Sequence, residues 1–203
     1  MRAQKGVTVW FTGLSGAGKT TVAKEVERIL KERNLYVQRL DGDIVRKSLT
    51  KDLGFSKEDR DKNIERNAFV AKLLTKNDII TLCSFISPYQ EARDKARKEI
   101  EEVGGFIEVF VNAPLKVCEE RDVKGLYKKA REGKIENFTG ISAPYEEPVN
   151  CDLELRTDQE TVAESAAKVI TYLEEHGYIP ETKDYTTEEE ELITERLNGL
   201  GYL

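Results

Sequence analysis

Short apolar runs alternate along the chain with longer stretches in which apolar residues recur at helical spacing. Buried strands are predicted over residues 7–12, 36–41, 79–84, 106–111 and 153–156. Helices are predicted directly after the first strand and over residues 44–50, 57–76, 89–102, 115–121 and 159–175. Regular alternation of strands and helices is typical of α/β proteins, so we expect a mostly parallel central sheet flanked by helices.

A glycine-rich stretch separates the first predicted strand from the helix that follows it. Residues 13–20 read GLSGAGKT, a full match to the pattern G-x-x-x-x-G-K-[ST] of phosphate-binding P-loops, and predict the three-layer fold of P-loop NTPases and kinases. In this motif backbone N–H groups and a helix N-terminus converge on phosphate oxygens. We expect Lys19 to reach the β- and γ-phosphates of ATP and Thr20 to ligate Mg²⁺. The predicted nucleotide contacts come from Gly13, Ser15, Gly16, Ala17, Gly18, Lys19, Thr20 and Thr21.

Two carboxylates follow the second predicted strand, at the edge of the sheet where ligands bind in α/β folds. Asp41 and Asp43 can hold Mg²⁺ or accept a proton from an attacking hydroxyl, so with Lys19 they are the catalytic candidates. A plain helix N-cap is the alternative for Asp43. Because the third strand ends without an Asp, we expect Asp41 or Asp43 to complete the Mg²⁺ site with Thr20 and water, and we assign Asp41. Arg46 opposes the dipole of its helix, which favours an anionic ligand beside it.

Further candidates lie on the next helix and after the third strand. Arg60, Asn63 and Asn67 fall on one face of the 57–76 helix, and the first two could present donors to a phosphate or sulfate. Spacing alone favours a solvated helix face instead. Ser87 could be a nucleophile, but no His or Lys lies close in sequence to activate it. We prefer the interpretation that Ser87, which precedes Pro88, is the N-cap of a helix.

Two segments depart from the alternating pattern. Residues 122–150 are rich in bases and then in Gly, Pro and polar residues, which predicts a mobile lid over polyphosphate; a solvated helix with an ordinary loop is the alternative. The bases are Lys124, Lys128, Lys129, Arg131 and Lys134. Residues 180–203 are acidic and carry an apolar stripe, which predicts an appended amphipathic helix with no chemical role assigned. The expected organisation is one domain over residues 1–179 and a tail over 180–203.

Composition argues against several classes of function. The net charge is −6, and seven acidic against two basic residues in 181–203 leave the rest of the chain close to neutral, which disfavours DNA or RNA binding. No apolar run approaches the ~20 residues of a membrane span. A single histidine, His176, disfavours a His-based metal site or a Ser-His-Asp triad. Cys83, Cys118 and Cys151 lack metal-ligand spacing, so we expect reduced thiols in a cytoplasmic protein without a signal peptide.

Six motifs carry a resemblance that covers residues 5 to about 179. They are residues 13–20 (GLSGAGKT), 40–43 (LDGD), 54–60 (GFSKEDR), 85–89 (FISPY), 121–127 (RDVKGLY) and 138–141 (FTGI). In this order and spacing they resemble the adenylylsulfate (APS) kinase family. The resemblance implies a stand-alone enzyme that transfers the γ-phosphoryl of ATP, with Mg²⁺, directly to the 3′-hydroxyl of adenosine 5′-phosphosulfate (APS). It also implies a homodimer, with ATP sulfurylase as a candidate functional partner.

The same resemblance distributes roles over the acceptor site. Asp43 matches the residue near the 3′-hydroxyl, as base or orienter, and Phe55 and Phe138 match an aromatic pair that sandwiches the adenine of APS. The phosphosulfate is assigned to Arg46, Arg60 and Asn63. The backbone of Ile86 and Ser87 and the side chain of Lys124 complete the pocket, and Arg121 is assigned to ATP. Some relatives carry a phosphorylatable serine at the position of Ser87, but direct transfer leaves it outside catalysis.

Three other functions compete with this interpretation. The nearest is a kinase of the same fold that acts on another phosphorylated nucleotide, because a phosphosulfate and a pyrophosphate are similar anions. The second is a non-catalytic nucleotide-binding subunit that regulates a partner such as ATP sulfurylase through the acidic tail. A gluconate- or shikimate-type kinase is less favoured, because two aromatic residues near the acceptor suggest a base.

Overall fold

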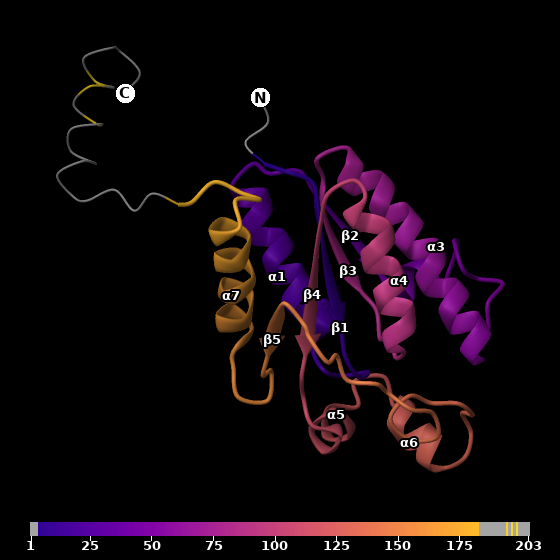
Figure 1. Ribbon diagram of the computed structural model, residues 1–203. Helices are drawn as coiled ribbons and strands as arrows, with labels where there is room; N and C mark the ends of the chain where they lie inside the picture. Colours follow the sequence, from indigo (N-terminus) through magenta and orange to yellow (C-terminus); the bar gives the residue numbers. More distant parts are fainter. Residues whose placement is uncertain (1–3, 183–193, 195, 197, 199–203) are drawn as a thin grey trace.

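The computed structural model describes residues 4–182 together with residues 194, 196 and 198. A five-stranded sheet with the order β2-β3-β1-β4-β5 runs through its centre, and all neighbouring strands are parallel (Figure 1). The strands are β1 (Val7–Thr12), β2 (Val37–Asp41), β3 (Ile80–Ser84), β4 (Gly105–Val111) and β5 (Leu153–Leu155). The parallel sheet predicted from the apolar runs is therefore confirmed.

Helices cover both faces of this sheet. On one face α1 (Lys19–Glu32) packs against α7 (Val162–Glu175), and on the other α3 (Lys57–Lys76) packs against α4 (Gln90–Glu101) (Figure 1). The shorter helices are α2 (Gly42–Val45), α5 (Leu115–Arg121) and α6 (Leu126–Arg131). Figure 1 shows α5 and α6 beyond the carboxyl ends of the strands. Three layers result, as predicted, and within the described part of the chain no helix has the length and apolar content to cross a membrane.

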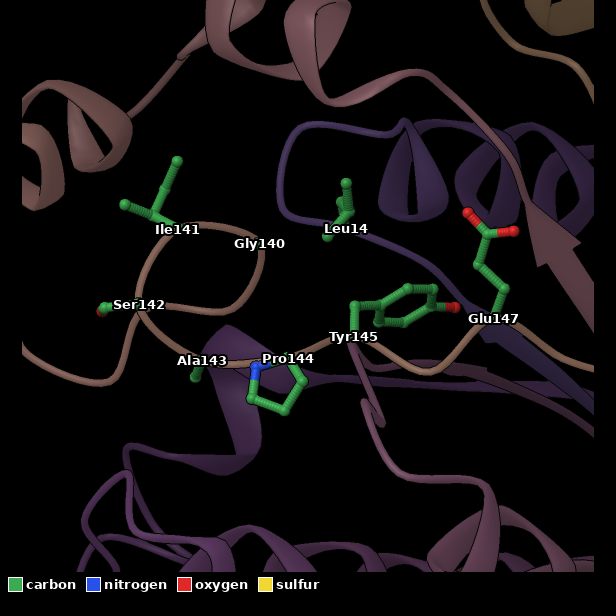
Figure 2. A pocket seen from close by; sticks show the side chains of 8 residues that line it. All are labelled: Leu14, Gly140, Ile141, Ser142, Ala143, Pro144, Tyr145 and Glu147. Carbon is green, nitrogen blue, oxygen red and sulfur yellow. The ribbon is translucent and has the colours of Figure 1, made fainter.

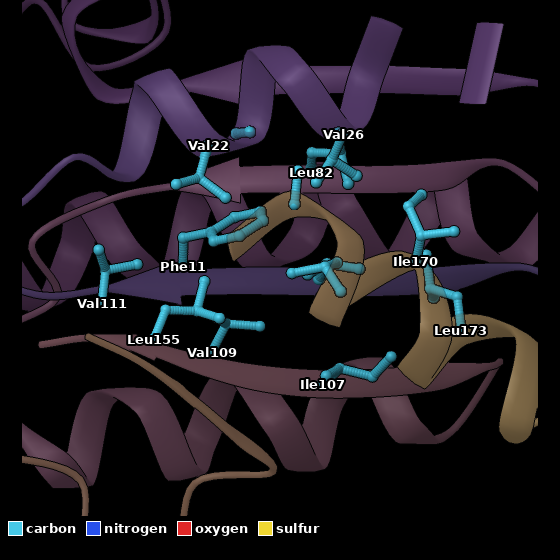
Figure 3. Close-up of a cluster of buried hydrophobic side chains, with 14 of the residues drawn as sticks. Phe11, Val22, Val26, Leu82, Ile107, Val109, Val111, Leu155, Ile170 and Leu173 are labelled. Atoms are coloured by element: carbon cyan, nitrogen blue, oxygen red, sulfur yellow. The ribbon is translucent and has the colours of Figure 1, made fainter. Parts of the chain in front are cut away.

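The central strand β1 is buried on both faces, because side chains alternate between the two helical layers. Val9 and Phe11 belong to a core with residues of α1 and α7, among them Val22 and Leu173 (Figure 3). Trp10, which lies between them in sequence, belongs to the second core, beneath α3 and α4. Apolar contacts on both sides thus fix β1, and its carboxyl end leads directly into the P-loop.

Several boundaries differ from the sequence prediction. The helix expected over 44–50 is the single turn α2, after which Lys47 and Ser48 donate from their backbone N–H groups in turns. The side chain of Arg46 donates to the carbonyls of Leu53 and Gly54, so the chain folds back there instead of continuing as a helix. Helix α7 begins three residues later than expected, because Thr161 and Glu164 form a capping box.

The structure also bears on the predictions made for the cysteines and for the C-terminal segment. The cysteines at 83, 118 and 151 are free, as expected, and the first two are buried. The amphipathic helix predicted over 180–203, with its apolar stripe, lies outside the described residues apart from residues 180–182 and three isolated positions. The lid segment, by contrast, is described throughout and contains α6.

Candidate active site at the carboxyl edge of the sheet

The P-loop connects β1 to α1 at the carboxyl edge of the sheet. Gly13 has a φ of 145°, and a Cβ built on it would lie 2.5 Å from the carbonyl oxygen of Val111, so only glycine fits. Gly18 has a φ of 105° and stands at the N-cap of α1. Backbone N–H groups at the start of this helix are therefore free of a side-chain cap, which leaves them suited to phosphate oxygens.

Lys19 is buried beneath the P-loop that it follows. Its Nζ donates to the carbonyl oxygens of Gly13 and Leu14, at 2.8 and 2.7 Å. Loss of solvent lowers the pKa of this lysine from 10.5 to about 8, partly offset by the nearby carboxylates Asp41 and Asp43. The ammonium group therefore lies inside the phosphate loop, and its charge is held there at an energetic cost.

Thr20 and Asp41 meet on the inner side of the loop. The Oγ1 of Thr20 donates to Oδ2 of Asp41 at 2.8 Å, and Arg39 contacts the same oxygen at 3.3 Å. Hydroxyl and carboxylate oxygens are the ligands that Mg²⁺ prefers, and Mg²⁺ usually uses one or two carboxylates and keeps several waters. The pair Thr20 and Asp41 fits such an ion, whereas no cluster of three or more acidic, His or Cys ligands exists among residues the structure describes.

The two acidic residues of the 40–43 motif have different surroundings in the structure. Asp41 is the N-cap of α2, and its Oδ1 accepts from the backbone N–H of Asp43 at 3.0 Å. The alternative that Asp43 is the cap is therefore wrong, because Asp41 holds that position. The Asp43 side chain is 65% exposed and its carboxylate is paired with the Nζ of Lys124 from the lid. Asp43 thus faces the open side of the site, next to a cation.

Arg46 and Arg60 converge on the aromatic residue Phe55. The guanidinium of Arg46 lies 4.5 Å from the centre of the Phe55 ring, and that of Arg60 lies 5.8 Å from it. Burial lowers the pKa of both arginines. Asp59 and Asp43 offset part of this effect at Arg46, whereas no carboxylate of the described residues does so at Arg60, and the two guanidinium groups bring two positive charges to this corner of the site. It is suited to a dianionic group.

The α3 face that carries Arg60 is not solvated. Arg60, Asn63 and Asn67 are only 8%, 7% and 0% exposed, so the solvated face favoured by spacing is wrong. The carbonyl oxygens of Phe55 and Asn137 accept from Arg60, and such partners, distant in sequence, cannot be found from spacing alone. Among the described residues the Oδ1 of Asn63 has no hydrogen-bond partner, so a buried acceptor on this face is left unpaired.

Arg60 also joins the two loops that carry the predicted aromatic pair. Its Nε donates to the carbonyl oxygen of Phe55 at 3.0 Å, and its Nη2 donates to that of Asn137 at 2.6 Å. Asn137 directly precedes Phe138, whose ring packs edge-on against Tyr127 at 5.0 Å between ring centres. Phe55 is 56% exposed. The structure therefore brings the two loops together and leaves the Phe55 ring open to a flat ligand.

Ser87 is buried and its hydroxyl is hydrogen-bonded within the protein. Its side chain is 2% exposed and its Oγ accepts from the indole Nε1 of Trp10 at 3.1 Å, which is inconsistent with an activated nucleophile. The interpretation of Ser87 as a helix N-cap is also wrong, because α4 begins at Gln90 and Tyr89 holds the cap position. The carbonyl oxygen of Ile86 accepts from Thr12 Oγ1 at 2.8 Å, which fixes this loop beside the P-loop.

The lid segment lies across the P-loop. Tyr127 Oη donates to the carbonyl oxygen of Ser15 at 2.8 Å, and Arg121 reaches the carbonyl oxygens of Gly16 and Thr157. The segment predicted as a lid is thus docked on the P-loop, and its role as a mobile lid stays a prediction. An open pocket of about 500 Å³ lies between Leu14 and the lid residues 140–145 and 147 (Figure 2).

Some site residues were not predicted from the sequence. Thr157 donates to the carbonyl oxygen of Ala17 at 2.6 Å, and Arg39 contacts Asp41. Tyr127 stands at the end of the 121–127 motif, so its place near the P-loop could have been found from that motif. Thr157 gives no such signal, because it lies in a short polar loop after a three-residue strand.

A family model for adenylylsulphate kinase matches residues 5–156, most of the chain. The chain belongs to the adenylylsulphate kinase family. The adenylyl-sulfate kinase of Halothermothrix orenii is 78% identical to this family member over 179 residues, which are 88% of the chain and 95% of that relative. The adenylyl-sulfate kinase of Rippkaea orientalis is 61% identical over 176 residues, 87% of the chain and 96% of the relative.

Solved structures extend the adenylylsulphate kinase likeness to three dimensions. The APS kinase CysC of Mycobacterium tuberculosis, solved in complex with AMPPNP and APS, superposes with a TM-score of 0.82 at 48% identity, over 84% of this chain and 99% of that one. A gluconokinase from Sinorhizobium meliloti has a TM-score of 0.53 at 14% identity. That second likeness is one of fold alone.

Proposed function

We propose that this family member transfers the γ-phosphoryl of ATP to the 3′-hydroxyl of APS, giving 3′-phosphoadenosine 5′-phosphosulfate (PAPS) and ADP. The observation that carries the proposal is the pairing of two half-sites at one sheet edge. A P-loop with Lys19 and Thr20 stands on one side, and the positive corner around Arg46 and Arg60 stands on the other. A 48% identical relative that was solved with AMPPNP and APS together supports the same division.

The donor half would bind ATP through the P-loop N–H groups and Lys19. Thr20 and Asp41 would hold Mg²⁺, which neutralises charge on the β- and γ-phosphates when bound. Phosphoryl transfer depends more on positioning and charge stabilisation than on covalent chemistry, so these contacts would provide most of what the donor needs. Arg121, which reaches the P-loop carbonyl of Gly16, would bind the nucleotide from the lid side.

The acceptor half would bind APS at both of its ends. Arg60 and Asn63 lie on the covered face of α3, and Arg46, at the end of α2, meets Arg60 at the Phe55 ring, so the two cations would hold the phosphosulfate there. Phe55 and Phe138 would flank the adenine. Binding energy from these remote contacts would place the 3′-hydroxyl in line with the γ-phosphorus.

Asp43 is the group we assign to the reacting hydroxyl. It lies in the first turn of α2, directly after β2, and its exposed carboxylate is paired with Lys124 on the open side of the site. When the 3′-hydroxyl attacks, its proton would pass to Asp43, or Asp43 would orient the hydroxyl until the proton leaves. Lys124 would then contact the transferred phosphoryl or the substrate. The closed lid would exclude water, which otherwise competes as acceptor.

A substrate panel tests this function against the nearest alternative. We expect ADP release from ATP and Mg²⁺ to require APS, and to be far slower with AMP, with other phosphorylated nucleotides, or with gluconate or shikimate. The control is Lys19→Ala, which should lose turnover while its circular dichroism spectrum stays that of the parent. Turnover with another nucleotide but not with APS would reassign the acceptor.

Three further properties are proposed with this function. We expect a cytoplasmic homodimer, as the family resemblance implies, and a hexameric APS kinase from Thiobacillus denitrificans supports self-association in general. Light scattering of the purified chain would measure its mass directly. A regulatory role toward ATP sulfurylase is the other alternative, and pull-down of that enzyme with and without residues 181–203 would test it.

A further inference from the structure

A buried arginine, Arg93, lies behind residues 86–88, the loop after β3 that borders the proposed APS pocket (the acceptor loop). Arg93 of α4 is 0% exposed, and its Nε lies 2.6 Å from Oε1 of Glu108, which is itself 3% exposed. Neither atom has another hydrogen-bond partner in the part of the chain that the structure describes, so the two groups depend on each other. A buried ion pair is a weak source of stability, because desolvation of both charges offsets their attraction. Its presence here calls for another reason.

The rest of the Arg93 guanidinium is directed at the acceptor loop. Its Nη1 donates to the carbonyl oxygen of Ser87 at 2.7 Å. Ser87 has a φ of 40°, which is unfavourable for a residue with a Cβ and persists only where the surroundings impose it. Trp10 donates to the side chain of Ser87 and Arg93 donates to its carbonyl oxygen, so both the side chain and the backbone of Ser87 are fixed.

The same guanidinium reaches the end of the lid. Its Nη2 donates to the carbonyl oxygen of Glu146 at 2.8 Å, and its Cζ lies 5.9 Å from the ring centre of Tyr145. Glu146 is joined to the acceptor loop twice more: its N–H donates to the carbonyl of Pro88 at 2.8 Å, and its Oε2 accepts from the N–H of Gln90 at 2.7 Å. Glu146 thereby caps α4, whose N-cap residue Tyr89 makes no capping hydrogen bond with its own side chain.

We propose that Arg93 is a positioning residue that locks the strained 86–88 loop to the returning end of the lid. Glu108 orients its guanidinium, and the planar fork spans two segments about 60 residues apart in sequence, which a lysine ammonium cannot do. The lock sets where the backbone of Ile86 and Ser87 stands in the acceptor pocket. The inference rests on the proposed function, because its consequence is measured on APS.

The test compares Arg93→Lys with a matched control on the same helix. Arg97 also lies near Glu108, at 3.8 Å, and binds Asp152 at 2.5 Å, but no contact of Arg97 with residues 85–89 or 145–147 is recorded in the described part of the chain. Arg93→Lys should raise the KM for APS about tenfold, because two hydrogen bonds that fix the loop are lost. The KM for ATP should change less than about twofold, and Arg97→Lys should leave both constants near those of the parent.

Glu108→Gln keeps the test decisive if Arg93→Lys does not fold. It removes the orienting charge and retains the shape, so we expect a smaller rise in the KM for APS, about threefold, again without a matching rise for ATP. A merely structural role would reduce the active fraction and the melting temperature without separating the two KM values. Equal changes in both constants, or none in either variant, would overturn the inference. Absence of APS turnover in the parent chain, measured in the same assay, would instead overturn the proposed function together with it.

Discussion

Lys19 illustrates how single residues of this site depend on their surroundings. Its type and position follow from the P-loop motif, but its burial and its contacts with Gly13 and Leu14 do not. The same is true of Asp41 and Asp43: the motif identifies both carboxylates, but only the backbone geometry decides which one caps α2. Residue types could therefore be predicted, whereas the partner of each group depends on tertiary contacts.

The low pKa of Lys19 predicts a pH-dependent affinity for ATP. Phosphates favour the ammonium form, so affinity should be full below the pKa of about 8 and should fall as the pH rises through it. Above that pH the decrease approaches about tenfold per pH unit. Titration of a fluorescent ATP analogue between about pH 7 and pH 9.5 would measure it.

Lys19→Arg is the control for this prediction, since a guanidinium stays charged across the range. Its weaker binding should be independent of pH. A flat profile for the parent chain, or the same slope in the variant, would show that Lys19 does not titrate there.

Arg60 is predicted to act on the acceptor and not on the donor. Arg60→Ala removes a buried cation and the link between Phe55 and Asn137, so the KM for APS should rise by about 100-fold and that for ATP far less. Arg66→Ala is the matched control on α3, because Arg66 pairs with Asp52 at the surface. Steady-state kinetics with each substrate varied would measure both. Similar increases for APS and ATP would argue against a phosphosulfate role.

At the scale of elements, the sequence pattern predicts the bounds of some helices and misses those of others. The helix expected over 57–76 and the one expected over 115–121 have the observed bounds. The prediction of a helix over 44–50 is wrong because Arg46 donates to the carbonyl oxygens of Leu53 and Gly54, contacts that no local pattern encodes. The basic lid contains the short helix α6, whose docking on the P-loop depends on the hydroxyl of Tyr127.

Tyr127→Phe isolates that docking contact. The ring can still pack against Phe138, but the hydrogen bond to the carbonyl of Ser15 is lost, so the free energy of unfolding should fall by about 1 kcal/mol. Turnover should fall further than with Tyr172→Phe, whose ring stacks on His176 of the distant helix end. Chemical denaturation and saturating kinetics would measure the two effects. Equal turnover in both variants would show that α6 docking does not limit the reaction.

At the scale of the molecule, the layered fold brings distant segments to one edge of the sheet. The P-loop, the 40–43 motif and the 85–89 motif lie where β1, β2 and β3 end, and α5 and α6 lie beyond the same edge (Figure 1). Their meeting could be predicted from a parallel sheet, since such strands share a carboxyl edge. The network around Arg93 could not, because α4 alone reads as a charged surface helix. The role of Arg93 depends on Glu108 of β4 and on the carbonyl oxygen of Glu146, which only the folded chain brings next to α4.

The most direct test of the central claim is which hydroxyl of APS receives the phosphoryl. ADP release and phosphorus NMR of the product would be measured with ATP, Mg²⁺ and three acceptors: APS, its 2′-deoxy analogue and its 3′-deoxy analogue. We predict turnover with the first two, a new phosphate on the 3′-oxygen, and none with the 3′-deoxy analogue. Turnover of the 3′-deoxy analogue, or a product phosphorylated elsewhere, would contradict the account.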